Sequence, residues 1–254
     1  MSYKISIITV CKNSEKTIKQ TLNSFKNQEF KNFENIIIDS SNNLRTLNII
    51  NRYKFNKIYL KKNFRLYDAI NKGIKISKGS IIGILHSDDY YSSSKSLKYI
   101  NEIFKVRNYD AVYGNINIKD KNGNKFRTWD NNKWSNARFL LGWHPPHTSL
   151  FFKKYLFKKY GFYKSEYKIA SDYDFIKRIF FNNKIKAFYI NKLITTMMHG
   201  GESTKSLKNI IKSNLECIKS WQNDNGYFLS SYIIIMLKIL RKLLNRFKTI
   251  YSKN

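Results

Sequence analysis

The chain has 254 residues, of which 42% are hydrophobic and 25% are charged. These values favour one α/β domain with a C-terminal extension over two separate domains. Two cysteines are too few for a disulfide framework and favour a reducing compartment. The formal net charge of +30 raises the question of nucleic acid. Because lysine and asparagine are spread over the whole sequence, we expect no nucleic-acid partner.

The first half of the chain predicts strands that alternate with helices. Short β-branched runs predict strands at residues 4–10, 35–39, 57–60 and 80–85. A helix is expected after a cap at Asn13 or Ser14, and a second one over residues 67–77, ended by Lys78 and Gly79. The stretch around residues 47–50 is less regular. This alternation is typical of a mostly parallel sheet with ligands at the carboxyl ends of its strands.

The second half carries a less regular pattern. Residues 110–117 predict a strand, and the turn at residues 121–124 predicts a hairpin. Pro145 and Pro146 predict a rigid turn before a strand at residues 148–152. The flanking residues Trp143, His144 and His147 make this turn a candidate for substrate contacts, with a plain turn as the equal alternative.

The segment that begins at Lys205 is basic and amphipathic. Apolar residues recur there at helical spacing: Ile233, Leu237, Leu240, Leu244, Phe247 and Tyr251. Its longest uncharged stretch, residues 227–237, is too short to cross a bilayer. We therefore expect a domain over residues 1–205 and a helical extension over 206–254 that lies on an anionic membrane surface. Packing of this helix on the core, or in a homodimer, is the alternative.

Two acidic residues follow the buried strand at residues 80–85, in the sequence His86-Ser87-Asp88-Asp89. Asp39 ends another strand, so all three carboxylates are expected at one edge of the sheet. Adjacent carboxylates there can hold a divalent cation against a phosphate, because hard cations prefer oxygen ligands. In an extended chain Asp88 and Asp89 point to opposite sides, which predicts one contact to a sugar or ribose hydroxyl and one to the metal. A structural turn is the alternative.

A second acidic cluster, Ser171-Asp172-Tyr173-Asp174, opens an amphipathic helix. Ser171 is the predicted N-cap, and Asp174 is expected to pair with Arg178 four residues later. Asp172 then faces a cleft, where the helix N-terminus favours its ionised form and suits a general base. The loop that begins at His199 could add a metal or phosphate contact, although a simple turn is favoured. A metal site and a separate base predict group transfer from a phosphorylated donor.

Together these segments resemble glycosyltransferase family 2, whose members have the GT-A fold. The similarity is carried by Ile5–Asn13, Ile36–Asp39, Tyr67–Gly73, Ser87–Asp89 and Ile169–Phe175. It implies a Rossmann-like α/β fold for nucleotide-diphospho-sugar transferases, and is strongest to bacterial surface-polysaccharide enzymes of the colanic-acid type. The sequence departs from the family pattern at Ser40-Ser41-Asn42, at Ser87 and at Ser171.

The resemblance also implies roles for individual residues. Nucleotide-sugar contacts would come from Thr9, Val10, Asn13, Asp39, Asp68, Asn71 and Asp88. Asp89 would hold Mn²⁺ or Mg²⁺, with His199 as a further candidate ligand, and Asp172 would be the catalytic base.

The function implied is inverting transfer from a nucleotide sugar, with UDP as the expected nucleotide, to a saccharide or lipid-linked saccharide. Such reactions build lipopolysaccharide, O-antigen or capsule. Because the N-terminus runs directly into a strand, we expect no secretory signal. The expected location is therefore the cytoplasm, peripherally on the inner face of the bacterial membrane. A catalytically silent glycan-binding or scaffold member, a basic nucleic-acid-binding protein and a nucleotidyltransferase remain as alternatives.

Overall fold

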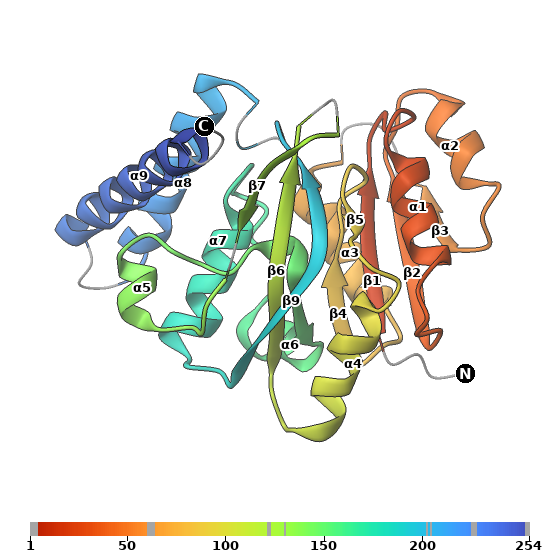
Figure 1. Cartoon of the computed structure of the whole chain (residues 1–254), viewed down its shortest axis with the longest axis horizontal. Coiled ribbons are helices and arrows are strands. Elements are labelled where there is room, and N and C mark those ends of the chain that lie inside the picture. The colour runs from red at the N-terminus through yellow and green to blue at the C-terminus, as the bar shows by residue number, and fades with distance from the viewer. Residues whose placement is uncertain are drawn as a thin grey trace.

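The structure is a computed structural model, and it describes residues 5–59, 64–120, 123–129, 131–201, 203, 205–224 and 228–251. A nine-stranded sheet runs through the middle in the order β3-β2-β1-β4-β8-β6-β9-β5, with β7 paired to β6 (Figure 1). The strands are β1 (Ile5–Cys11), β2 (Phe33–Asp39), β3 (Asn56–Tyr59), β4 (Ile81–Ile84), β5 (Tyr90–Tyr91), β6 (Ala111–Lys119), β7 (Lys125–Trp129), β8 (Leu150–Lys153) and β9 (Ala187–Met198).

The first four of these strands in the spatial order are parallel. β1 pairs with β2 from Ile5 opposite Phe33 to Cys11 opposite Asp39, and it pairs with β4 up to Ile8 opposite Ile84. This register brings the carboxyl ends of β1, β2 and β4 to one edge of the sheet. The four strands predicted from the first half of the sequence are confirmed within a residue or two, apart from Lys4 and Leu60, which lie outside the described residues.

The other half of the sheet is mixed. β8 is antiparallel to both β4 and β6, whereas β9 is parallel to β6. The end of β9 pairs with the short strand β5, with Thr196 opposite Tyr90. This pairing brings residues 196–199 to the same edge of the sheet as Asp88 and Asp89.

Helices cover both faces of the sheet. They are α1 (Ile18–Lys26), α2 (Leu44–Ile50), α3 (Leu66–Ile76), α4 (Ser96–Val106), α5 (Asn136–Leu140), α6 (Tyr155–Tyr160), α7 (Ser171–Ile176), α8 (Leu207–Gln222) and α9 (Phe228–Tyr251). A 3₁₀ turn spans His147–Ser149, and a π-helical segment, Lys177–Asn182, continues α7. Helix α2 occupies the stretch whose pattern was irregular, and the Asn43 side chain caps it by accepting from Arg45 N (2.9 Å).

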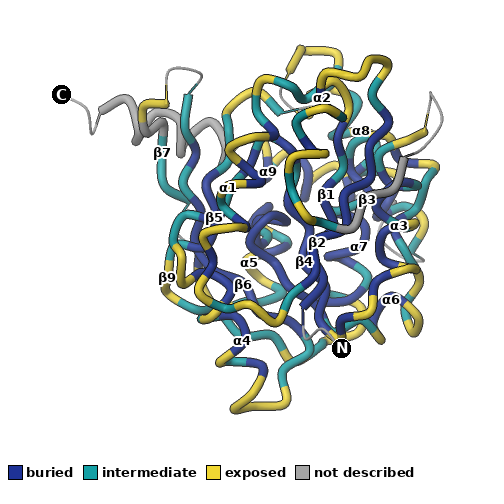
Figure 2. The backbone as a smooth tube through the Cα atoms, turned by 90° about the vertical axis from the view of Figure 1, so that its right-hand side faces the viewer, coloured by how far each residue is buried: buried dark blue, intermediate teal, exposed yellow. Residues whose placement is uncertain are grey.

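Alternate residues of the central strands point to two hydrophobic clusters. Ile8, Ile36 and Ile82 belong to the cluster on the α3 and α7 side, whereas Ile7, Ile37 and Ile81 belong to the cluster with α1 and α4. Burial on both faces explains why these strands are apolar throughout rather than alternating. Figure 2 shows β1, β2 and β4 as a buried centre with exposed segments around it.

The start of α7 differs from the prediction. Ala170, not Ser171, is the N-cap residue, and the buried Ser171 hydroxyl has no hydrogen-bond partner in the described part of the chain. No side chain caps α7 within the described residues. The Glu216 carboxylate of α8 instead holds the segment that leads into the helix, because it accepts from the backbone N–H groups of Lys168 (2.9 Å), Ile169 (2.8 Å) and Ala170 (2.9 Å).

Helix α9 packs on the core through one side. Ile234 and Ile235 are buried, and the ammonium of Lys238, which the amphipathic pattern put on the polar face, is buried against Cys217 Sγ (3.0 Å). Gly142 makes this approach possible: its φ is +80°, and a Cβ there would lie 2.3 Å from Lys238 Cα.

The opposite side of α9 is apolar and exposed. Ile233 and Leu240 are 57% and 46% exposed, as the amphipathic pattern predicts, whereas Leu237 is half-buried. The side chains of Leu244, Phe247 and Tyr251 lie outside the described set. Among the described helices, none is long and apolar enough to cross a membrane. The division into residues 1–205 and 206–254 stays a prediction.

Candidate active site

The loops that follow β1 and β2 are tied together at the carboxyl edge of the sheet. Asn13 has a positive φ of 51°, its N–H donates to Ser41 Oγ (2.8 Å), and its Oδ1 accepts from Asn42 N (3.0 Å). Asp39 Oδ1 accepts from the N–H (3.1 Å) and hydroxyl (2.6 Å) of Ser41. Ser41, one of the departures from the family pattern, therefore holds both predicted donor-binding residues in fixed positions.

Thr9 and Val10 occupy less accessible positions. Thr9 is fully buried, and its hydroxyl donates to Asn35 Oδ1 (3.4 Å) inside the sheet. Val10 is half-buried and packs against the hydrophobic cluster of the α3 side. The hydroxyl of Thr9 is thus engaged within the sheet rather than directed to the edge.

Asp88 and Asp89 stand in a turn, not in the extended chain that was expected, because Asp89 N donates to His86 O (3.1 Å). The turn still separates them: Asp88 is half-buried, and Asp89 is only 2% exposed. Asp89 Oδ1 accepts from Met198 N (3.2 Å), and Ser87 Oγ contacts Ser14 Oγ (2.8 Å). Burial, and secondly the nearby charge of Asp88, raises the pKa of the Asp89 carboxyl well above its usual range.

These residues offer oxygen ligands suited to Mg²⁺ or Mn²⁺. Within the described residues no basic side chain forms an ion pair with Asp89, and no group of three or more His, Cys, Asp or Glu residues is gathered as a metal cage. His199 is exposed and directly follows Met198, the residue that donates to Asp89. The Asp88 and Asp89 carboxylates at this edge fit a cation that takes its remaining ligands from donor phosphate oxygens and water.

Asp172 lies in the first turn of α7 and is half-buried. The Tyr67 hydroxyl of α3 lies 3.1 Å from Asp172 Oδ1 and 2.5 Å from Ile169 O. Tyr163 stacks on Tyr67 with ring centroids 5.8 Å apart. The carboxylate is thus held from one side by aromatic residues that sequence reasoning had not singled out.

His147 connects this aromatic pair to the first acidic cluster. Its Nε2 lies 3.0 Å from Tyr163 OH, and its ring centroid is 5.9 Å from that of His86. Burial lowers the pKa of His147 to about 4, an effect that Asp172 opposes and His86 reinforces. The proline turn therefore places a neutral, buried imidazole between the two acidic clusters, and its contact with substrate stays a prediction.

Asp174 has the structural role predicted for it. It is 1% exposed, and its Oδ2 accepts from Arg178 Nε (2.8 Å). Its Oδ1 accepts from Ser220 Oγ (2.9 Å) and lies 3.5 Å from Lys164 Nζ. Asp172 and Asp174 therefore serve different sides of α7, as their spacing on a helix requires.

The remaining predicted contacts, Asp68 and Asn71, lie on α3. Asp68 is half-buried and accepts from Ser165 Oγ. Asn71 donates to Tyr163 O (2.7 Å) and accepts from Tyr163 N (3.1 Å), so its amide fixes the loop that carries Tyr163. A buried tyrosine beside an acidic motif was the available signal for Tyr67, whereas nothing in the local sequence indicates Glu216.

A mixed sheet of this order, with an acidic turn after β4 and a carboxylate at the start of a later helix, defines a GT-A glycosyltransferase fold. The chain belongs to glycosyl transferase family 2, whose profile matches residues 6–163.

The chain is similar to proteins that are named as glycosyltransferases. The chain is 26% identical over 201 residues, 75% of each chain, to the PGL/p-HBAD biosynthesis glycosyltransferase of Mycobacterium tuberculosis. It is 39% identical over 94 residues, 36% of this chain and 38% of the relative, to the Escherichia coli UDP-Glc:alpha-D-GlcNAc-diphosphoundecaprenol beta-1,3-glucosyltransferase WfaP.

Solved structures share the fold at low identity. S. aureus TarS residues 1–349 in complex with UDP-GlcNAc matches with a TM-score of 0.64 and 21% identity, over 91% of this chain and 70% of that one. The chain spans 43% of the longer TarS structure. The mannosyltransferase PcManGT from Pyrobaculum calidifontis, in complex with GDP-Man and Mn²⁺, matches with a TM-score of 0.64 and 12% identity, over 94% of this chain and 74% of that one.

Proposed function

We propose that the protein is an inverting glycosyltransferase that uses a nucleoside-diphosphate sugar and a saccharide or lipid-linked saccharide acceptor in bacterial surface-polysaccharide synthesis. One observation carries the proposal. The turn with Asp88 and Asp89 and the helix start with Asp172 are joined through a continuous set of contacts, from His86 through His147 and Tyr163 to Tyr67. His147 lies against His86 and is close enough to Asp172 for that carboxylate to shift its pKa, which supports a donor at the first cluster and a base at the second acting on one bond.

The donor is expected to bind across the ends of β1, β2 and β4. Asn13 and Asp39 are fixed through Ser41, which favours a preformed site for the uridine. Asp68 and Asp88 are half-buried and accessible for sugar or ribose hydroxyls. TarS has been solved in complex with UDP, and WfaP is named as a UDP-Glc glucosyltransferase, which makes UDP the first nucleotide to test.

Asp172 is the proposed general base. Its carboxylate would accept the proton of an acceptor hydroxyl as that hydroxyl attacks the anomeric carbon from the side opposite the leaving group. One displacement of this kind inverts the anomeric configuration. The Tyr67 hydroxyl would hold the carboxylate in place through Oδ1 and leave the other oxygen for the acceptor.

Asp89, with Asp88 and His199 beside it, would hold Mn²⁺ or Mg²⁺. A cation bound there would neutralise negative charge that builds on the departing nucleoside diphosphate. Asp89 itself is positioned by Met198 N and, through its own carbonyl, by the Thr21 hydroxyl (2.7 Å).

The test is nucleotide release with Mn²⁺ over a panel of UDP-, GDP- and dTDP-sugars, with EDTA in parallel. We expect metal-dependent release from one donor, lost in Asp89→Ala and retained in Glu102→Ala, an exposed carboxylate on α4 that serves as the matched control. If the whole panel is silent, calorimetric titration with UDP decides. Heat would indicate that the acceptor is missing, whereas no heat would contradict the proposal and favour a glycan-binding or scaffold role.

We propose further that α8 and α9 attach the protein to an anionic membrane surface. Leu207, Ile211 and Leu215 recur on the exposed side of α8, and Tyr232, Ile233, Met236, Ile239 and Leu240 are exposed on α9. Since Ile234 and Ile235 pack on the core, truncation after Gln222 would also open the interior, and surface substitutions test the idea more cleanly.

The triple variant Ile233→Gln, Ile239→Gln, Leu240→Gln should lose sedimentation with vesicles that contain phosphatidylglycerol, whereas Val106→Gln, a 78% exposed residue on α4, should not. Unchanged partitioning would contradict membrane attachment. A concentration-dependent dimer in the native chain that this triple variant dissociates would assign the surface to a homodimer instead.

A further inference from the structure

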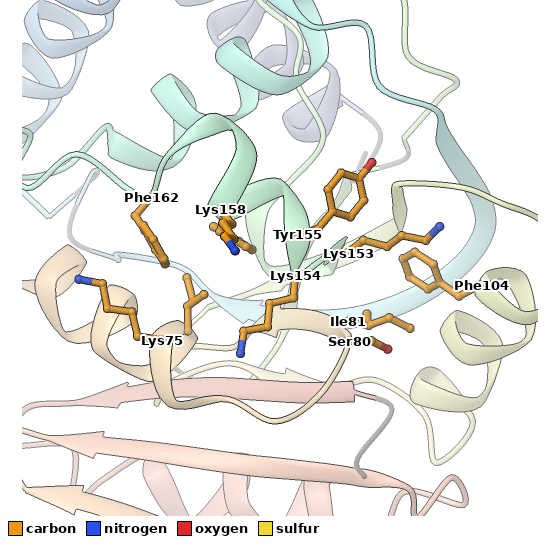
Figure 3. A pocket seen from close by; sticks show the side chains of 11 residues that line it. Lys75, Ser80, Ile81, Phe104, Lys153, Lys154, Tyr155, Lys158 and Phe162 are labelled. Carbon is orange, nitrogen blue, oxygen red and sulfur yellow. The ribbon is translucent and has the colours of Figure 1, made fainter.

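A pocket of about 570 Å³ lies at the sheet edge opposite the candidate active site. It is formed by the last turn of α3, the beginning of β4, the last turns of α4, and the segment from the end of β8 through α6 to Phe162 (Figure 3). Ser80 directly precedes β4 and Ile81 begins it, whereas Asp88 and Asp89 follow the other end of that strand. The volume is in the range of small-molecule sites, which is roughly 300–1,000 Å³.

The inner surface of the pocket is apolar. Ile74, Ile81 and Phe157 are buried there, and the rings of Phe104 and Phe162 stand on its two sides (Figure 3). An occupant gains binding energy from this surface only by bringing apolar area of its own, because contact between apolar surfaces is what removes water.

Lysines surround the mouth: Lys75, Lys153, Lys154 and Lys158. In the described part of the chain none of the four forms an ion pair, and no carboxylate lines the pocket. Asp110, which is not a lining residue, accepts from Tyr155 OH (2.6 Å).

These lysines differ in how firmly they are held. Lys153 and Lys154 donate to Asn108 Oδ1 and Ser77 O, and Lys75 Nζ stands 5.3 Å from the Phe162 ring centroid. Lys158 is exposed, and no hydrogen bond or ion pair engages its ammonium within the described residues. The positive potential at the mouth is therefore available to a ligand.

We propose that this pocket binds a single-chain anionic amphiphile, a long-chain alkyl or prenyl phosphate. The chain would lie against Phe104, Ile81 and Phe162, and the phosphate would sit among Lys75, Lys154 and Lys158. A neutral amphiphile would leave the lysines without an anion, and a small soluble anion would leave the apolar surface in water. The inference does not depend on the transfer reaction, because no residue of the pocket belongs to the active-site edge.

The test is calorimetric titration of the full chain with dodecyl phosphate below its critical micelle concentration. We expect saturable binding with one site per chain, and much weaker binding of inorganic phosphate and of dodecanol. Lys158→Gln should weaken binding about two- to fivefold, the loss of one charged contact at an exposed site. Lys159→Gln is the matched control, since Lys159 is the next residue of α6, is exposed and contacts the Tyr160 ring (5.0 Å) outside the pocket.

A second variant tests the apolar part. Ser80→Phe adds a ring at the exposed mouth and should abolish binding while the thermal unfolding midpoint stays within a few degrees of the native chain. Equal affinity in the native chain, Lys158→Gln and Ser80→Phe would place the amphiphile elsewhere, on the exposed faces of α8 and α9, and would overturn the proposal. Absence of saturable binding, or equally tight binding of dodecanol, would overturn it as well.

Discussion

The molecule has two acidic pairs, Asp88–Asp89 and Asp172–Asp174. In each pair one carboxylate is buried and the other lies at the edge, but the two buried carboxylates have different partners. Asp174 is matched by Arg178, Lys164 and the Ser220 hydroxyl. Asp89 accepts a backbone N–H from Met198, and no described basic residue pairs with it. A buried carboxylate is costly unless it is paired. Asp174 is thus a scaffold residue, whereas the burial of Asp89 would be offset by the cation that the proposed function assigns to it.

The half-buried members differ as well. Asp172 is held by Tyr67 and lies near the neutral imidazole of His147. These surroundings suit a carboxylate that exchanges a proton. Asp88 lies near the thiol of Cys11, whose pKa is raised first by burial and then by the charges of Asp39 and Asp88. This concentration of negative charge at the sheet edge favours a cation and hydroxyl-bearing ligands rather than a second base.

The largest expected effect is a loss of transfer activity that distinguishes Asp172 from Asp174, the other carboxylate of α7. Asp172→Asn removes the proton acceptor while it keeps the size and polarity of the side chain. We expect transfer to fall about 10²- to 10⁴-fold, the usual contribution of a general base, with donor affinity retained. Single-turnover rates and UDP calorimetry on the same preparation measure both quantities. Near-normal turnover would assign the base to another residue.

The complementary variant, Asp174→Asn, should change stability instead. It leaves Arg178 and Lys164 beside a neutral amide in a buried site, and we expect a loss of about 3–5 kcal/mol in the free energy of unfolding. Urea unfolding monitored by far-ultraviolet circular dichroism measures the loss, with Asp172→Asn as the control that should stay within about 0.5 kcal/mol of the native chain. Equal destabilisation by both variants would remove the distinction between scaffold and functional carboxylate.

His147, which lies between the two acidic pairs, predicts that the free energy of unfolding depends on pH. His147 has a pKa of about 4 in the folded chain, so between pH 6.5 and 4 the unfolded chain binds a proton that the folded chain does not. Stability from this group is therefore complete above pH 6.5 and lost as the pH falls toward 4, by up to about 3 kcal/mol.

Unfolding free energies in metal-free buffer from pH 7 to 4 test this dependence. His147→Gln, whose amide can still meet Tyr163 OH, should flatten the profile, whereas the exposed His199→Gln should leave it unchanged. An identical slope in His147→Gln and the native chain would show that other groups cause the dependence.

The fold of the first half was predictable because its information is local. Strands β1, β2 and β4 are continuous apolar runs, and α3 has its stop signal in Lys78 and Gly79. Helix α2 escaped prediction because its buried side consists only of Thr46 and Ile50, too few to set a period.

In the C-terminal part the decisive contacts are distant in sequence. Glu216 holds the segment before α7, and the Lys238 ammonium is buried against Cys217 Sγ, so Ser171 was wrongly predicted as a cap and Lys238 wrongly placed on the polar face. A helix with apolar residues on two sides has two candidate faces, and only the shape of the core selects the buried one. The same limit hid the proximity of Tyr67 and His147 to Asp172, which depends on the packing of α3 and the proline turn against α7.

The smallest effect concerns the hydroxyl that holds the proposed base. Tyr67→Phe keeps the stacked ring against Tyr163 and removes only the contacts to Asp172 Oδ1 and Ile169 O. A net hydrogen bond contributes about 1 kcal/mol, so kcat should fall about fivefold to tenfold. Because the hydroxyl touches the base and not the donor, KM for the nucleotide sugar should stay unchanged. A rise in KM with constant kcat would instead assign Tyr67 to donor binding, and would weaken the contrast between a donor cluster at Asp88–Asp89 and a base cluster at Asp172.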